Sequence, residues 1–218
     1  MIKTERVVKT AEYLKAELYA CDYFKGRPEE IDYRYEHSIR VANIGSEIAK
    51  REGIDEEMMV IACLLHDIAY SRTFPEGHDW RDHGRDGAKI AREFLRTLGF
   101  DEAQINEICY GIAIHVDDET DFEGERTPLA LSVSDADNID RFDVYRIYDS
   151  LSYISFDKMS LVEKTERCRV VLDKLEQFRQ MPFGTKSGSE LWLEKLDFQV
   201  EFFTRLYNQM QNSVFTED

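Results

Sequence analysis

The sequence predicts an all-α protein that folds as one domain over residues 1–218. Apolar side chains recur every three or four residues along most of the chain, which is the period of an amphipathic helix. No run shows the apolar and polar alternation of a strand, and Gly and Pro fall in short breaks between the periodic runs. No internal repeat or interdomain linker divides the chain, whose length permits a substantial core.

Capping residues and breaks place the ends of the helices. Asp55 and Asp101 stand where an N-cap side chain is expected, and Pro128 suits the first turn of a helix. Gly53 ends one periodic run, and the break at 25–28 ends another. The helices expected from these signals cover residues 7–23, 31–51, 55–67, 82–99, 101–115, 128–142, 143–155, 159–180 and 188–212.

The charge of the chain excludes some classes of partner. Lys and Arg number 28 against 44 Asp and Glu, so the formal charge is -16. Such a surface repels the phosphates of nucleic acid and of anionic membranes, and we expect neither polymeric nucleic acid nor a membrane as partner. A small phosphorylated substrate is still possible, because a metal ion reverses the potential inside a pocket.

The N-terminus and the cysteines indicate a cytoplasmic protein. Residues 1–6 lack the apolar run of a signal peptide, and no stretch approaches the ~18 apolar residues of a membrane span. The four cysteines are far apart and form no CxxC pair, so we expect reduced thiols rather than disulfides or a zinc knuckle.

Several ionisable residues lie on apolar helix faces. His66, His115 and Asp137 each follow apolar residues at helical spacing, and His37 shares a helix face with the apolar residues that come after it. A polar group that faces a core must be paired, since an unsatisfied one costs roughly 1–3 kcal/mol. Each residue alone is more commonly a hydrogen-bonded core residue, yet four of the five histidines, His83 included, fall near helix faces or ends. A metal ion would satisfy all of them together.

The order of these residues resembles that of a known family. His37, then the pair His66-Asp67, then a distant Asp137 is similar to the HD-domain superfamily of metal-dependent phosphohydrolases. Residues 82–88 and 183–188 are similar to segments of small bacterial HD hydrolases, some of which are nucleotide pyrophosphatases. The resemblance implies a helical HD fold, with the metal site in residues 31–142 and further helices in 143–212. It also implies His37, His66, Asp67 and Asp137 as metal ligands.

The last ligand is ambiguous from periodicity alone. Asp135 and Asp137 both lie among apolar residues at helical spacing. We favour Asp137, because the pair Ala136-Asp137 matches the form of the family. Asp135 is then expected to brace a histidine by a hydrogen bond.

The ligand types and the resemblance suggest the chemistry. Nitrogen and oxygen donors suit one or two ions of manganese, iron, nickel, cobalt or zinc, and such ions activate water and polarise phosphoryl groups. The expected substrate is a small phosphorylated molecule, a nucleotide phosphoester or pyrophosphate. We predict that Asp67, His83 and His115 take part in catalysis. Arg40, Arg81 and Arg85 are candidate substrate contacts, although each alone is more commonly a solvated surface residue.

Two other functions stay open. His83 and His115 extend the order to that of the binuclear branch of the superfamily, in which Asp67 would bridge two metals. That branch includes phosphodiesterases and mixed-valence di-iron oxygenases, so an oxygenase is the first alternative. The second is a non-catalytic helical module with a vestigial metal site. A homodimer is also possible, because the last helices are rich in large apolar residues, namely Leu191, Trp192, Leu196, Phe202 and Phe203.

Overall fold

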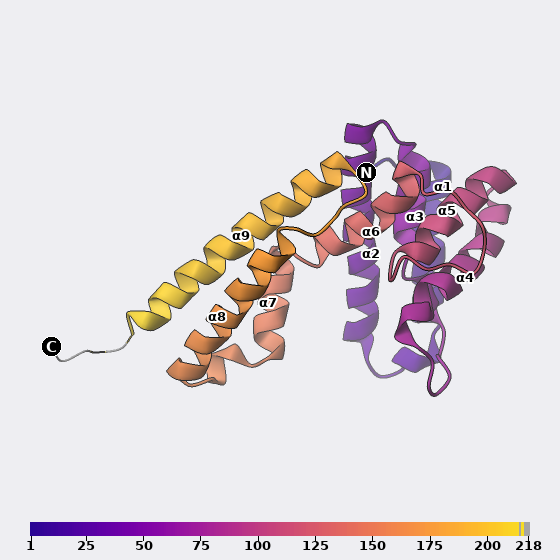
Figure 1. Ribbon diagram of the computed structural model, residues 1–218. Coiled ribbons are helices and arrows are strands. Elements are labelled where there is room, and N and C mark those ends of the chain that lie inside the picture. The colour runs from indigo at the N-terminus through magenta and orange to yellow at the C-terminus, as the bar shows by residue number, and fades with distance from the viewer. Residues whose placement is uncertain (214, 216–218) are drawn as a thin grey trace. The chain divides into compact units, whose positions relative to one another are not determined.

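The computed structural model describes residues 1–213 and 215, and these residues form helices, turns and loops without any strand (Figure 1). The prediction of an all-α protein is therefore confirmed. The α-helices are α1 (Glu5–Tyr19), α2 (Pro28–Glu52), α3 (Glu56–Leu65), α4 (His83–Thr97), α5 (Glu102–Ile114), α6 (Pro128–Asp140), α7 (Val144–Tyr153), α8 (Leu161–Phe178) and α9 (Lys186–Gln211). Short 3-10 helices are η1 (Asp22–Phe24), η2 (Ile68–Ser71), η3 (Trp80–Asp82) and η4 (Phe156–Lys158).

The chain divides into two compact units. The first contains Met1–Asp140 and the short segment Phe183–Gly188, and the second contains Arg141–Pro182 and the chain from Ser189 onward. Whether the two units fold together as the one domain expected from the sequence is a separate question, and that expectation stays a prediction. Every histidine and every predicted metal ligand lies in the first unit.

Helix α3 is the centre of the first unit. Its residues Met58–Leu65 are all buried, and it packs against α1, α2, α5 and α6. The Asp55 side chain accepts a hydrogen bond from the backbone N–H of Met58, as expected of an N-cap. The helix ends at Leu65, and His66 and Asp67, which follow directly, are buried in the core.

The ends of the first two helices differ from the prediction. Helix α1 begins at Glu5, because the Thr4 side chain caps it. Helix α2 begins at Pro28, where a residue without a backbone N–H loses no hydrogen bond. It ends at Gly53, whose φ of 71° is the left-handed conformation that favours glycine.

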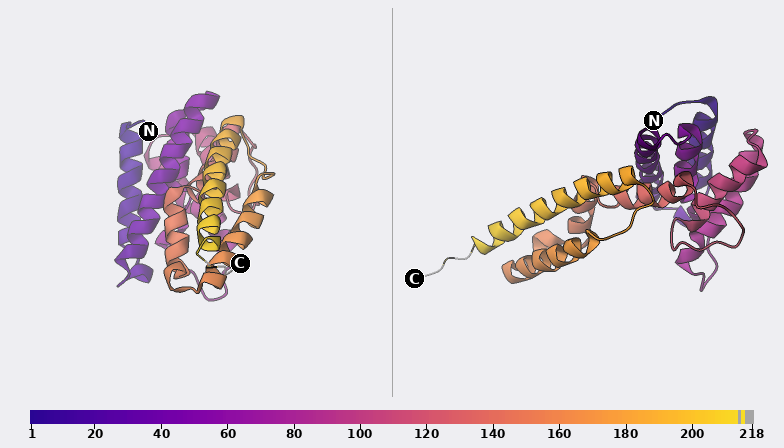
Figure 2. Two further views of the ribbon diagram at one scale, coloured as in Figure 1. Left: turned by 90° about the vertical axis from the view of Figure 1, so that its left-hand side faces the viewer. Right: turned by 45° about the horizontal axis from the view of Figure 1, so that its top comes forward.

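The second unit has an apolar core of its own. Leu196 and Phe203 of α9 pack with Ile147, Cys168 and Leu175 from α7 and α8. Figure 2 shows α9 running beside α8, and the indole of Trp192 donates a hydrogen bond to the Phe178 carbonyl. The large apolar residues of α9 are thus used largely within the unit, and a homodimer stays a prediction.

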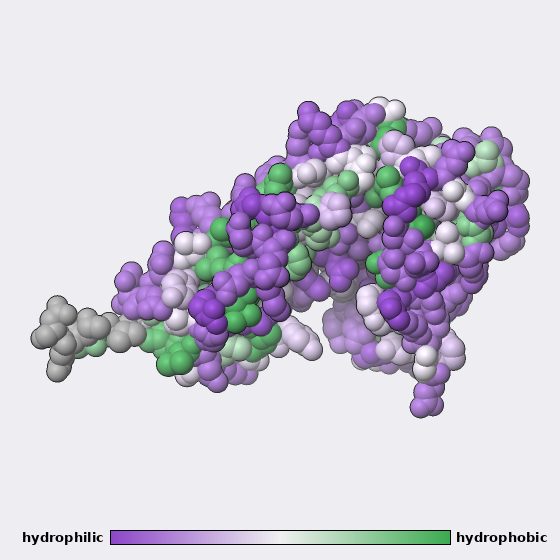
Figure 3. Space-filling model, in the orientation of Figure 1, coloured by the Kyte–Doolittle hydropathy of each residue, from purple (hydrophilic) through white to green (hydrophobic). Residues whose placement is uncertain are grey.

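The surface and the thiols agree with the composition. Hydrophilic residues cover most of the face of the first unit seen in Figure 3. Within residues 1–213 and 215, no helix is both long and apolar enough to cross a membrane. All four cysteines are free, and Cys63, Cys109 and Cys168 are buried, whereas Cys21 is only partly so.

We predict that Gly84→Ala destabilises the packing of α4 on α5. An added Cβ would lie 2.6 Å from the Ala113 carbonyl oxygen and 3.0 Å from that of Ile112, and backbone atoms cannot move aside cheaply. Overpacking costs roughly 1–3 kcal/mol and alanine restores at most about 1 kcal/mol of helix propensity, so the free energy of unfolding should fall by about 1–2 kcal/mol. Chemical denaturation measures this change.

The control is Glu93→Ala on the exposed side of the same helix, which removes only a surface ion pair with Arg96. Its unfolding free energy should change by less than about 0.5 kcal/mol. A Gly84→Ala protein as stable as the wild type would contradict the packing described here.

Candidate metal centre

His37 enters the centre from the middle of α2, on the face that points toward α6. Its Nδ1 lies 2.7 Å from an oxygen of Asp140. Its Nε2 lies 3.1 Å from Oδ1 of Asp137 and 3.2 Å from Nε2 of His66. One ring nitrogen is therefore held by a carboxylate, and the other faces the ligands of neighbouring helices.

His66 and Asp67 follow the last turn of α3. The Nδ1 of His66 lies 2.7 Å from the Cys63 carbonyl oxygen, so this nitrogen carries the proton and donates it. The Nε2 of His66 is left without a proton and points to Oδ2 of Asp67, at 3.7 Å. The same Asp67 oxygen accepts a hydrogen bond of 3.0 Å from Arg34.

His83 and His115 reach the other oxygen of Asp67. The Nε2 of His83 lies 3.3 Å from Oδ1, and the Nε2 of His115 lies 3.8 Å from it. Each ring donates its Nδ1 proton to a backbone carbonyl one turn earlier, that of Trp80 at 2.5 Å and that of Ile112 at 2.7 Å. These two histidines begin α4 and follow α5, and the packing of the two helices brings them together.

The four histidines share one arrangement, which suits a metal. Each has its Nδ1 in a hydrogen bond and its Nε2 directed at Asp67 or Asp137. The four histidines and these two aspartates are all buried. Hydrogen bonds of this kind orient imidazole ligands in metal sites. Within the described residues, three groups have donor atoms close enough to share one ion: His37, His66 and Asp67; His66, His115 and Asp137; Asp67, His83 and His115. Mixed nitrogen and oxygen donors fit a divalent transition metal.

The family of this centre follows from comparison with known proteins. Residues 34–141 match the model of the HD domain, and this match contains all six residues. The chain belongs to the HD superfamily. The resemblance stated from the sequence is thereby confirmed, and so is the HD fold.

One solved structure agrees at the level of the fold. A crystal structure of a predicted HD superfamily hydrolase from an uncultured Thermotogales bacterium matches with a TM-score of 0.63 at 24% identity, over 92% of this chain and 91% of that one. The HD domain of the phosphodiesterase PgpH of L. monocytogenes gives a TM-score of 0.36 at 15% identity, over 80% of this chain and 93% of that one.

A curated relative matches only in part. An uncharacterized protein of Methanocaldococcus jannaschii is 37% identical over 71 residues, which is 33% of this chain. The match also spans only 33% of the length of that relative.

Burial and neighbouring charges set the protonation of the HD centre. Burial alone would lower the pKa of His37, but hydrogen bonds to Asp137 and Asp140 outweigh it and raise the pKa to about 9. Burial lowers the pKa of His66 to about 4, which keeps that ring neutral. Burial would raise the pKa of Asp67, yet the surrounding histidines and Arg34 hold it well below its usual range. A neutral imidazole and an ionised carboxylate are the forms that bind metals, so His66 and Asp67 already have the binding form, whereas His37 would release its Nε2 proton when a metal binds.

The three aspartates of α6 have different partners. Asp137 faces His37, and its role as the last metal ligand stays a prediction. The expectation that Asp135 braces a histidine is wrong, because Asp135 accepts hydrogen bonds from the backbone N–H groups of Gly184 and Thr185. Asp140 braces His37 instead. The reason is helical: residues 137 and 140 share a face, whereas 135 and 137 point about 200° apart.

The arginines near the centre are paired with carboxylates. Arg40 donates to Asp140 at 2.8 Å and thereby supports the brace on His37. Arg81 binds Asp79, and Arg85 binds Asp82 and Asp117. The substrate contacts predicted for Arg40, Arg81 and Arg85 stay predictions.

Sequence reasoning missed Arg34 and Asp140. The Arg34 side chain contacts Asp67 directly and lies 3.6 Å over the ring of Tyr70. A signal for both existed in the sequence, because each stands three residues from a predicted ligand, Arg34 before His37 and Asp140 after Asp137. Residues three apart on a helix are neighbours on its surface.

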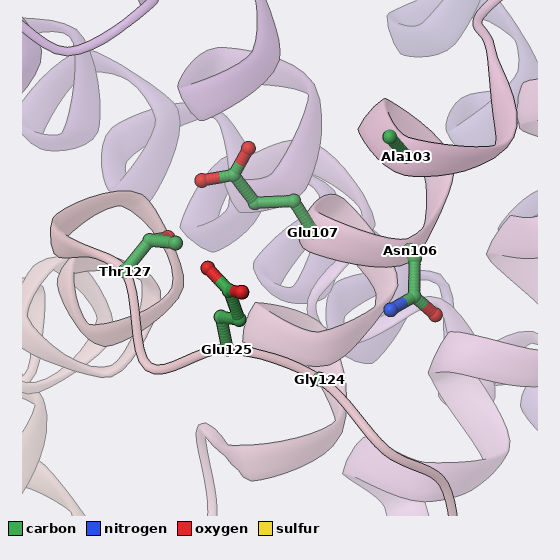
Figure 4. Close-up of a pocket in the computed structure, with 6 residues that line it drawn as sticks. All are labelled: Ala103, Asn106, Glu107, Gly124, Glu125 and Thr127. Atoms are coloured by element: carbon green, nitrogen blue, oxygen red, sulfur yellow. The ribbon is translucent and has the colours of Figure 1, made fainter.

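The first unit also has a surface hollow that none of the four clustered histidines lines; its lining residues are Ala103, Asn106, Glu107, Gly124, Glu125 and Thr127. Its volume is about 330 Å³, and Figure 4 shows Glu107 of α5 with Glu125 and Thr127 of the segment before α6. It contains no imidazole and no buried charge, and exposed carboxylates are common without a ligand. We therefore assign no ligand to this hollow.

We predict that Asp140→Asn weakens metal binding by about ten- to a hundred-fold, the usual effect of losing a carboxylate that orients a histidine ligand. The substitution keeps the shape of the side chain and removes its charge from His37. Competition with a chelator for Zn²⁺ measures the affinity.

Asp135→Asn is the matched control, because it removes a buried carboxylate of the same helix that does not contact His37. It should leave Zn²⁺ affinity unchanged. Equal affinity in Asp140→Asn and wild type would show that Asp140 does not orient the ligand.

Proposed function

We propose that the chain is a metal-dependent phosphohydrolase that acts on a small phosphorylated molecule, a nucleotide phosphoester or pyrophosphate. The observation that carries the proposal is the convergence of four imidazole Nε2 atoms on two buried carboxylates. Membership of the HD superfamily and the likeness to a predicted HD hydrolase support it. A bound divalent metal supplies an activated water and polarises the phosphoryl group.

The donor set favours two ions rather than one. His37, His66 and Asp137 would hold the first, with Oδ2 of Asp67 on their side. His83 and His115 would hold the second, with Oδ1 of Asp67 on theirs. Each oxygen of Asp67 faces one pair of histidines, so this carboxylate could serve both ions as a shared ligand. Manganese, iron, nickel, cobalt and zinc all accept such ligands.

The chain supplies positive charge and proton transfer beside these ligands. Arg34 is the closest guanidinium to Asp67 and would offset negative charge on the phosphoryl oxygens. With a single ion, His83 or His115 would instead move the proton between water and the leaving oxygen. Water then adds to phosphorus, the phosphoester or phosphoanhydride bond breaks, and the proton goes to the departing oxygen.

An oxygenase is the second candidate, favoured by the presence of His83 and His115 beside Asp67. It requires iron, dioxygen and a substrate C–H bond, whereas hydrolysis requires only water and a leaving group. A non-catalytic module would retain the metal and lack turnover of either kind.

We predict that the purified chain binds two Mn²⁺ ions and releases phosphate or pyrophosphate from members of a nucleotide and phosphoester panel. Asp67→Asn should abolish the release. A double variant, His83→Ala with His115→Ala, should bind one ion and lose activity. Elemental analysis and phosphate detection measure both properties.

His78→Ala is the control, because His78 lies outside all three donor groups. It should retain both ions. Rapid oxygen uptake by the iron-loaded protein with a polyol or phosphonate, without phosphate release, would favour the oxygenase. Absence of metal, together with a melting temperature that chelation leaves unchanged, would contradict the metal centre itself.

A further inference from the structure

An exposed tryptophan borders the metal centre. The chain has two tryptophans; Trp192 is buried at 1% exposure, whereas Trp80 is 65% exposed. The Trp80 ring stacks loosely on that of His83, with centroids 6.3 Å apart and planes 26° apart. Trp80 is therefore a large apolar surface left in water next to a predicted metal ligand.

Hydrogen bonds hold the backbone at Trp80. The Trp80 carbonyl accepts the Nδ1 proton of His83, so the two residues are tied at both ring and backbone. The turn that carries them is closed by Asp79, whose side chain accepts a hydrogen bond from the N–H of Arg81. The backbone of Trp80 is therefore held next to His83, while its ring keeps most of its surface in water.

The other aromatic residues of this region are engaged with one another. Phe74 stacks on His78 at 4.5 Å and meets the edge of Tyr70 at 5.8 Å. Tyr70 in turn contacts Arg34 and His83. These rings are at least half-buried, so that Trp80 is the ring of this group with the most free surface.

The arginines of this region are paired with carboxylates, so a substrate would gain from a contact that does not depend on charge. Arg34, Arg81 and Arg85 each bind a carboxylate, which reduces the attraction they offer to distant parts of an anionic substrate. His83 lies between Asp67 and Trp80, so a substrate with its phosphoryl group at Asp67 would meet Trp80 where its remaining part passes His83. Stacking on an aromatic ring recognises any planar base without depending on charge.

We propose that Trp80 forms a stacking subsite for the aromatic ring of the substrate, so that the centre prefers nucleotides to phosphoesters without a ring. This inference rests on the proposed function for the position of the phosphoryl group. Trp80 is then a specificity-determining residue, which contributes to binding and leaves the hydrolytic step to the buried ligands.

The test compares two substrates that differ only in the ring, a nucleoside 5′-monophosphate and ribose 5-phosphate. Trp80→Ala should raise KM for the nucleotide by about ten-fold, the size expected for one stacked base, and leave kcat little changed. KM and kcat for ribose 5-phosphate should stay as in the wild type. Trp80→Phe should restore much of the loss. Tyr153→Ala, an exposed ring of the second unit, is the control and should behave as the wild type.

Binding gives a readout that needs no turnover. Because Trp192 is buried, saturable quenching of tryptophan fluorescence by the nucleotide in the Zn²⁺-loaded protein reports on Trp80. Calorimetry should find the same affinity and a loss in Trp80→Ala.

The outcomes separate this inference from the proposed function. Equal losses for both substrates in Trp80→Ala, or no quenching by the nucleotide, would overturn the stacking subsite while hydrolysis stands. Saturable quenching in the wild type, with a calorimetric affinity for the nucleotide that Trp80→Ala lowers about ten-fold, would support the subsite even if the wild type hydrolyses neither substrate. That lack of hydrolysis would count against the proposed function alone.

Discussion

The structure of the first unit depends on the carboxylate of Asp67. This side chain is 8% exposed and lies among four imidazoles and a guanidinium, with two histidines facing each of its oxygens. A buried charge is costly unless it is paired and hydrogen-bonded. The requirement for partners explains why helices from distant parts of the sequence meet at this point.

The helices are arranged so that each supplies one part of these surroundings. The apolar helix α3 delivers His66 and Asp67 at its C-terminus, where the chain leaves the helix inside the core. Close packing of α4 on α5, which Gly84 permits, brings His83 beside His115. In α6, helical spacing separates Asp137, which faces His37, from Asp135, which accepts hydrogen bonds from Gly184 and Thr185. Burial and the Nδ1 hydrogen bonds thus fix the imidazole orientations before any ligand binds.

Much of this fold was predictable from the sequence, for identifiable reasons. Helical periodicity and capping residues such as Asp55 and Asp101 depend on local interactions, and the structure bears them out. The predicted ligands on apolar faces do meet, because a helix face that must be buried can be recognised from spacing alone. Their order along the chain then matched that of the HD superfamily, which indicated that they belong to one site.

The remaining features depend on tertiary contacts that spacing does not encode. Arg81 and Arg85 are close to His83 in sequence, yet they point to Asp79, Asp82 and Asp117. Asp135 satisfied the same periodic argument as Asp137, because spacing does not say which side of α6 faces His37; in the structure that side carries Asp137, and Asp135 binds Gly184. The division into two units likewise reflects packing between segments far apart in the chain.

The central claim is that the Nε2 atoms of the clustered histidines bind metal while their Nδ1 atoms keep the hydrogen bonds seen here. Nitrogen NMR of the chain labelled with ¹⁵N in its histidine rings, titrated with Zn²⁺, tests it most directly. The Nε2 resonances of His37, His66, His83 and His115 should shift on binding, with Nδ1 still protonated, and His78 should serve as an unchanged internal reference. Rings that stay unperturbed at saturating Zn²⁺, or a shift confined to His78, would contradict the account.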